Sequence, residues 1–416
     1  MSAIVIPQIF TCMTFPNNKN AGLGLLYNKT KTHARWRVFL WLFLLCAAPV
    51  YATPLIQFAG FAYSGAYQDI QIAYPYTKAI NTKNAQGISL LNQALEARLV
   101  HQHFKGFRFN DSALGRIHSN NPLALAFVLT SENVSIEHIG STYKTLIILT
   151  GQALLYNEAK REVMVDYPIG FQYVDLFHTR PSQSTLQNLV RKLYVGHLSA
   201  NIFRTFVKRL HTMRLRSQYG HTIRVMAVHI APRAMAPLPP AQKANLLALK
   251  SFIADQFSAD LSVHNHMPVL PYMEGNAIGN VIALRFANGK VFNLTVPQPD
   301  YSLILTLAGF KKLLYQQGSW GKSWLYGVFV HVKLLEPLSG HAYMNAMIKQ
   351  AAIKIVPQSQ TTVRNWPAYD ATLSNLLDQL SVAIAHPTRH WAGIHMDHAR
   401  DVSQLSAFKK VARSCR

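Results

Sequence analysis

Cysteine is nearly absent from this chain. Only three of the 416 residues are cysteine, and Cys12 and Cys46 both fall in the first 52 residues, which leaves Cys415 alone in the remainder. A disulfide within that remainder is therefore excluded. Exported eukaryotic proteins of this size usually carry several disulfides. If the chain is exported, its cysteine usage favours a bacterial envelope, in particular a Gram-negative periplasm.

Acidic residues are also scarce. Residues 1–52 hold five of the 41 lysines and arginines and none of the 18 acids, so the remainder has 36 basic residues against 18 acidic ones, a formal charge of +18. From Leu176 to Lys250 there is no acid at all, although this stretch contains twelve basic residues. Such a balance favours association with phosphate-rich or otherwise anionic surfaces.

Motifs that would identify an enzyme are missing too. The sequence contains no G-x-S-x-G elbow, no H-E-x-x-H pair and no dinucleotide fingerprint. Gly321-Lys322-Ser323 resembles the end of a phosphate-binding loop, but Gln316 stands where that loop needs its first glycine. We therefore expect a non-enzymatic protein, and we expect no cofactor.

One long apolar run is present, and it has the layout of a secretory signal peptide. Arg35 and Arg37 precede the uninterrupted apolar segment 38–48, and Val50 and Ala52 form an A-x-A-like cleavage site. The run is shorter than the roughly 20 apolar residues that a membrane span needs. The sequence predicts a signal peptide at 35–52 that is cleaved near Ala52, with an uncleaved anchor as the alternative. Residues 1–34 are expected to be a non-native or disordered leader.

Hydrophobic periodicity predicts alternating strands and helices. Strands are predicted at 55–63, 143–156, 162–173, 222–230 and 324–335, and a hairpin at 281–296. Amphipathic helices are predicted at 89–103, 182–196, 198–216, 241–257 and 369–385. The segment 301–316 fits either a helix or a strand followed by a helix.

This mixture predicts an α+β fold with mixed or antiparallel sheets, long β-hairpins and amphipathic helices. The order strand, helix, hairpin, helix occurs twice along the chain. One interpretation is two related α+β halves, 53–218 and 219–385, and the other is a single continuous domain. We expect the segment 386–416 to form a basic, histidine-containing tail.

The helix predicted at 198–216 is the candidate binding element. Its apolar residues gather on one side, and basic residues occupy the other. A basic amphipathic helix suits anionic lipid head groups or an anionic envelope polymer, while an ordinary solvated helix face is the plainer interpretation. The candidate residues for an anionic surface are Arg204, Lys208, Arg209, Arg214 and Arg216.

A second candidate lies near the C-terminus. His395 and His398 are three residues apart and could share one helical face, where imidazoles bind zinc, copper or nickel. The spacing matches no closed structural metal site, so a tail without bound metal is the alternative.

These observations lead to two hypotheses. The first is an exported, non-enzymatic binding or assembly factor at an anionic periplasmic surface, with an anionic membrane or envelope polymer and an envelope protein as its partners. Nucleic acid is disfavoured as a partner, because aromatic and basic residues do not interleave along the sequence. The rival hypothesis is an exported hydrolase of cell-wall or sugar polymers whose carboxylates meet only in the folded protein.

Overall fold

A computed structural model describes residues 54–65, 67–109, 123–139, 141–196, 199–213, 215, 219–273, 277–278, 281–287, 289–358, 360 and 363–416. The predicted leader and signal peptide lie outside these residues. Helices and mixed sheets alternate along the chain, so the predicted α+β class is confirmed. In this part of the chain, no helix combines the length and the apolar character that crossing a membrane requires.

The first sheet contains four long strands, namely β1 (Leu55–Ser64), β3 (Leu123–Ile139), β4 (Thr142–Asn157) and β5 (Glu162–Phe177). β1 and β3 are parallel, whereas β3, β4 and β5 are consecutive antiparallel neighbours. The short β2 (Arg108–Phe109) pairs with the start of β1. Between β1 and β2 the chain forms α2 (Tyr67–Ala73), α3 (Pro75–Ile80) and α4 (Leu90–Leu99).

The second sheet has the same arrangement, built from β6 (Ile223–Ile230), β10 (Tyr301–Gly318), β11 (Gly321–Leu335) and β12 (Ala342–Pro357). β6 is parallel to β10, and β10, β11 and β12 are consecutive antiparallel neighbours. β1 and β6 belong to different sheets. Each sheet thus consists of one strand, a parallel partner reached through helices, and two further antiparallel strands.

A hairpin from the later part of the chain completes the first sheet. It consists of β8 (Val281–Phe286) and β9 (Val291–Thr295), preceded by the short β7 (Ala277–Ile278). β8 pairs antiparallel with β1 through Ala62 and Phe286, and β9 meets β5 at Glu162 and Thr295. The pairings therefore return to β1, and this strand has neighbours on both sides.

Alternation of side chains along the strands places a core on each face of the first sheet. Leu125, Phe127 and Leu129 of β3 point into one cluster, where α5 (Gln183–Val195) and α6 (Ile202–Thr212) pack. The intervening Ala124, Ala126 and Val128 point into another cluster, which the β8–β9 hairpin covers. Capping fixes where the two helices begin, because the side chains of Ser182 and Asn201 accept hydrogen bonds from backbone amides of the first turn.

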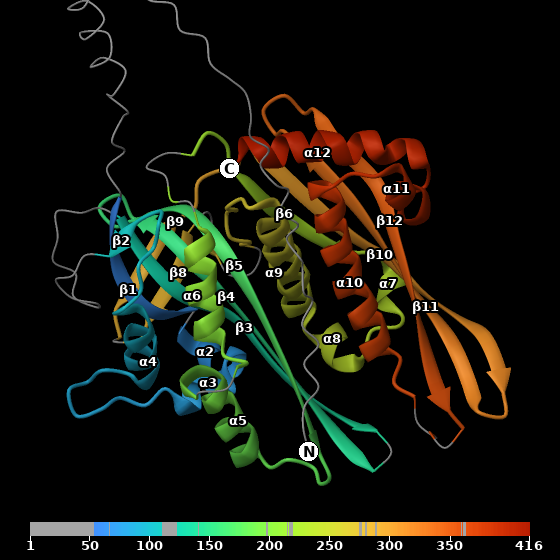
Figure 1. The fold of residues 1–416 in the computed structure, drawn as a ribbon, viewed down its shortest axis with the longest axis horizontal. Coiled ribbons are helices and arrows are strands. Elements are labelled where there is room, and N and C mark those ends of the chain that lie inside the picture. The colour runs from blue at the N-terminus through green and yellow to red at the C-terminus, as the bar shows by residue number, and fades with distance from the viewer. Residues whose placement is uncertain are drawn as a thin grey trace, which may run out of the picture. The chain divides into compact units, whose positions relative to one another are not determined.

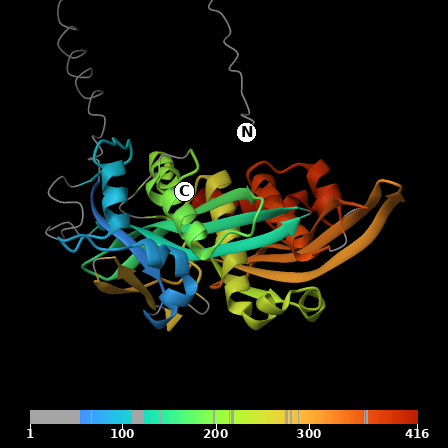
Figure 2. The same ribbon diagram turned by 90° about the horizontal axis from the view of Figure 1, so that it is seen from below.

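The second sheet has a large core on one face only. Val328, Val330 and Val332 of β11 are buried against helices, whereas the alternating Phe329, His331 and Lys333 are only half-buried. The covering helices include α9 (Leu246–Asn265), α10 (Trp366–Ala385) and α12 (Val402–Ser414). Two short helices, α7 (Pro232–Met235) and α8 (Pro240–Ala244), connect β6 to α9. Figures 1 and 2 show the ends of β10–β12 running past these helices.

The prediction of a C-terminal tail at 386–416 is wrong. The segment forms α11 (Arg389–His395), a short 3-10 helix (Ala399–Asp401) and α12, and Leu405, Phe408 and Val411 are buried in the core of the second sheet. The basic residues and Pro387 suggested a loose end. The apolar spacing of 405, 408, 411 and 412, which is that of an amphipathic helix, outweighs them.

Other predicted elements need smaller corrections. The segment 301–316, expected to contain a helix, is part of the continuous strand β10. The helix predicted at 198–216 is shorter and ends at Thr212, and the one predicted at 241–257 is interrupted before α9, which continues to Asn265. The hairpin of β4 and β5 and the strand β6 lie where the sequence predicted them.

Candidate binding surface on the second sheet

The far end of the second sheet exposes large apolar side chains. We call residues 313–325 and 353–357 the sheet tip. Leu314 is 48% exposed, Tyr315 65%, Trp320 44% and Ile355 63%. Gly321 makes the tight turn between β10 and β11 possible, because its φ is +137° and an added Cβ would lie 2.2 Å from the carbonyl oxygen of Val356. The tip is thus a well-formed hairpin end rather than a frayed one.

The strands that carry the tip are basic. β10, β11 and β12 contain six lysines and no acidic residue, namely Lys311, Lys312, Lys322, Lys333, Lys349 and Lys354. The equivalent strands of the first sheet contain one lysine and five acids, namely Lys144 and Glu132, Glu137, Glu162, Asp166 and Asp175. Apolar exposure and a single sign of charge therefore coincide on the second sheet.

Aromatic and basic side chains interleave across these strands. The Lys312 ammonium lies 4.0 Å from the centre of the Trp324 ring and donates a hydrogen bond to the Asn365 Oδ1 at 2.9 Å. Tyr326 donates to the same oxygen, also at 2.9 Å. Burial and the nearby Lys354 lower the pKa of Lys312. The interleaving that the linear sequence lacks is present in space, because β10 and β11 place Lys312 beside Tyr326.

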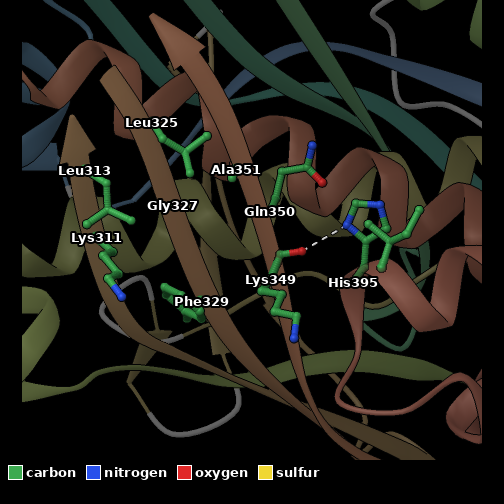
Figure 3. A pocket seen from close by; sticks show the side chains of 10 residues that line it. Lys311, Leu313, Leu325, Gly327, Phe329, Lys349, Gln350, Ala351 and His395 are labelled. Atoms are coloured by element: carbon green, nitrogen blue, oxygen red, sulfur yellow. Dashed lines mark hydrogen bonds between the residues drawn. The ribbon is translucent and has the colours of Figure 1, made fainter. Parts of the chain in front are cut away.

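A groove on the less covered face of the sheet extends from the tip, which contributes Leu313 and Leu325 to its lining (Figure 3). Its volume is about 440 Å³. β10, β11 and β12 form its floor and α11 forms one wall, with lining residues Lys311, Leu313, Leu325, Gly327, Phe329, Lys349, Gln350, Ala351, Ile394 and His395. The His395 ring is held by a 3.0 Å hydrogen bond between its Nδ1 and the Lys349 carbonyl oxygen, and it stacks on Trp391.

The predicted basic helix is only partly a surface. Arg204 and Lys208 are exposed on α6, so their role at an anionic surface stays a prediction. Arg214 and Arg216 lie outside the described residues. Arg209 is half-buried, and its guanidinium donates a hydrogen bond to the Ser262 hydroxyl and lies 5.3 Å from the centre of the Tyr167 ring, so the side chain is directed inward and not towards an exposed face. Arginine side chains are usually solvated, but the position of Arg209 on α6 directs its side chain towards Ser262 of α9.

Arg209 belongs to a charge cluster with two acids, of which Asp166 is buried and Asp255 is half-buried. Asp166 is 2% exposed, and burial raises the pKa of its carboxyl well above the ordinary value, with Asp255 adding to the rise and Arg209 opposing it. Burial raises the pKa of Asp255 to about 7, although a hydrogen bond with the Thr130 side chain lowers it. The two carboxyls influence each other electrostatically, as the hydrolase hypothesis would require of a catalytic pair. However, Asp166 is closed to a polymer substrate.

Another acid with a raised pKa has a structural role. The Glu132 carboxylate accepts hydrogen bonds from the backbone amides of Tyr76 and Thr77, both at 2.8 Å, and from the Thr77 hydroxyl. It therefore satisfies the first turn of α3, where helix amides have no partner of their own. Burial still raises its pKa.

The two candidate metal ligands serve other contacts. His395 is fixed in the wall of the groove, as described above. His398 precedes the 3-10 helix, and its backbone amide donates to the Asp401 Oδ2 at 3.1 Å. Within the described part of the chain, no group of three or more His, Cys, Asp or Glu side chains is arranged to hold a metal ion. Metal binding by this pair stays an untested prediction.

Sequence reasoning missed the tip and the groove. The pattern of 301–316 suggested a helix. A usable signal was present: between Asp300 and Glu336 the sequence has four lysines and no acid. Had that whole stretch been recognised as a hairpin, the alternation would have placed lysines and large apolar residues together on its exposed end.

Comparisons with known proteins leave the function open. No family model and no curated protein matches this chain. Solved structures that match include a hypothetical protein from Chlamydia trachomatis (10% identity, covering 38% of this chain and 96% of that one, TM-score 0.22) and a minor lipoprotein from Acinetobacter baumannii (8%, 44% and 92%, TM-score 0.20). A DUF330 protein from Xanthomonas campestris also matches (12%, 42% and 87%, TM-score 0.20). These neighbours are bacterial, but TM-scores this low carry no argument about fold or function.

Proposed function

We propose that this protein is a non-enzymatic binding factor of a bacterial envelope that attaches to an anionic lipid surface through the sheet tip. The observation that carries the proposal is the coincidence of exposed apolar side chains with lysines and no acid on β10–β12. Lysines are attracted to anionic head groups, and apolar side chains gain by leaving water for the acyl boundary. The predicted signal peptide and the lack of disulfide-forming cysteines support an envelope location.

A lipid surface suits the tip better than a nucleic acid does. Leu313, Leu314, Ile353 and Ile355 are aliphatic and about half exposed or more. Aliphatic side chains offer no ring on which a base could stack, whereas they enter a lipid interface readily. Trp320 and Tyr315 add the aromatic residues that favour the boundary between water and lipid.

The proposal is tested by co-sedimentation with phosphatidylglycerol-containing vesicles and with phosphatidylcholine vesicles. The triple variant Leu314→Ser, Tyr315→Ser, Trp320→Ser is expected to lose at least about tenfold in affinity for the anionic vesicles, because each residue contributes on the order of 1 kcal/mol when partly immersed. The matched control is Val174→Ser with Leu176→Ser on β5, which removes exposed apolar side chains from the first sheet.

An unchanged affinity of the triple variant contradicts the proposal. Loss of affinity in Arg204→Ala with Lys208→Ala instead would move the contact to α6. Equal binding to both vesicle types at low salt would remove the electrostatic part of the argument, because attraction between exposed charges is strongest there and is screened as salt is raised.

A further inference from the structure

The groove beside the tip has a floor made by three strands in register. Lys311 of β10 pairs with Gly327 of β11, and Gly327 pairs with Ala351 of β12. One row further towards the tip, Leu313 pairs with Leu325. Because paired residues point to the same side of a sheet, these side chains share the less covered face. The position of the groove is therefore set by the strand register and does not depend on the conformation of a single side chain.

The lining is chiefly apolar, with its positive charges at one end. Leu313, Leu325, Phe329 and Ile394 provide most of the apolar surface. In Figure 3 the Phe329 ring lies between the Lys311 and Lys349 side chains, while Leu313 and Leu325 lie further along the strands. None of the ten described lining residues is Asp or Glu. The groove thus has an apolar lining, with the side chains of Lys311 and Lys349 at one end.

Gly327 keeps the middle of the floor open. A Cβ placed on Gly327 would meet the Phe329 ring at 3.6 Å and Lys311 at 3.7 Å, which are ordinary contact distances. A side chain here would consequently be tolerated by the neighbours but would occupy the groove. At about 440 Å³ the groove falls in the lower part of the roughly 300–1,000 Å³ range of small-molecule sites. This size suits one acyl chain better than two.

We propose that the groove binds a single-chain anionic amphiphile, with its acyl chain along Leu313, Leu325 and Ile394 and its anionic group between Lys311 and Lys349. The inference rests on the proposed function, since it names the class of lipid molecule that the same sheet would bind at an anionic lipid layer. A peptide strand would need the backbone groups of a sheet edge, whereas the groove lies on a sheet face. A second copy of the chain would bring lysines against lysines.

The experiment is isothermal titration of the full chain with oleate and with lysophosphatidylglycerol, each below its critical micelle concentration. Two further probes each lack one feature. Lysophosphatidylcholine has an acyl chain but no net charge, and inorganic phosphate is anionic but has no acyl chain. We expect one bound molecule per protein for both anionic amphiphiles, binding at least tenfold weaker for lysophosphatidylcholine, and no detectable heat with phosphate. Preference between oleate and lysophosphatidylglycerol distinguishes a carboxylate from a phosphate head.

Gly327→Leu fills the groove and is expected to weaken oleate binding at least tenfold. Ile394→Glu, on an exposed position of α11, places a negative charge in the wall and is expected to do the same without touching the core. Oleate binding that survives both substitutions, or phosphate binding as strong as oleate binding, overturns the inference. The triple tip variant separates the two proposals: it should bind oleate normally while losing vesicles, and Gly327→Leu should keep its vesicle binding.

Discussion

The first sheet, β1-β3-β4-β5, and the second sheet, β6-β10-β11-β12, share one strand order but differ in what covers them. The first has a core on each face, because the β8–β9 hairpin covers the side opposite α5 and α6. The second is covered on one face and carries six lysines without an acid on its three long strands. The comparison shows that helices and a hairpin cover the first sheet on both faces, whereas one face of the second sheet is less covered, and to this face we assign a ligand.

The largest expected effect tests the difference in covering. Phe127→Ala in β3 removes a fully buried ring that contacts the rings of Phe61, Phe203 and Phe206, and we expect it to destabilise the fold by about 3–5 kcal/mol. Phe329→Ala on the less covered face of β11 is the matched substitution, and we expect it to cost less than about 1 kcal/mol. Urea unfolding followed by circular dichroism measures both. Equal losses would show that the two faces are covered alike.

The next effect concerns the helix between the two sheets. α9 contacts β5 and also covers the second sheet, and it carries Asp255. Because the pKa of Asp255 is about 7 in the fold and near 3.8 in an unfolded chain, the folded state binds this proton more tightly. Stability should therefore fall as pH rises from about 4 to about 7.

Asp255→Asn is expected to reduce that dependence, to which Asp166 and Asp260 also contribute, and to raise stability at pH 8 by on the order of 2–4 kcal/mol. Chemical denaturation at pH 5, 6.5 and 8 measures the change. Asp397→Asn, at an exposed position of the C-terminal segment, is the control and should leave the pH profile as it is. If Asp255→Asn leaves the dependence of the unfolding free energy on pH unchanged, ionisation of Asp255 does not control that dependence.

The smallest effect tests the difference in charge. Lys354→Glu in β12 is expected to weaken binding to anionic vesicles by about 1–2 kcal/mol, since a basic residue near such a surface contributes about 1 kcal/mol. Lys144→Glu in β4 makes the same charge reversal on the first sheet and should change the affinity less than twofold. Co-sedimentation at low and physiological salt checks both. If the two substitutions weaken binding equally, net charge rather than the second sheet controls attachment.

The parts of the fold that sequence predicted are those in which local pattern and tertiary structure agree. The β4–β5 hairpin and α5 have clear periodicity and clear turn or cap residues, and the structure has both. β10 was harder, because residues such as Lys311, Lys312 and Gln316 suit a helix locally. Pairing with β6 and β11 decides its conformation, and that information lies far away in the sequence.

The candidate site was less predictable than the fold. Arg209 and Lys208 are neighbours in sequence and equally basic, yet one points into the protein and the other is exposed. Helix rotation relative to α9 makes that difference, and composition does not encode it. The groove depends on cross-strand neighbours from three strands and on α11, so no single stretch of sequence contains it.

The pairing of β1 with β8 affects how the chain can fold as it is made. β1 is among the first strands synthesised, but its edge is completed by Phe286 and its neighbours, which follow only after the first sheet's other long strands and α9 have emerged. Contacts this distant form slowly, because a long loop must close first. Until then the first sheet remains unfinished. Closure of the first sheet is therefore expected to be a late step in the folding of this chain.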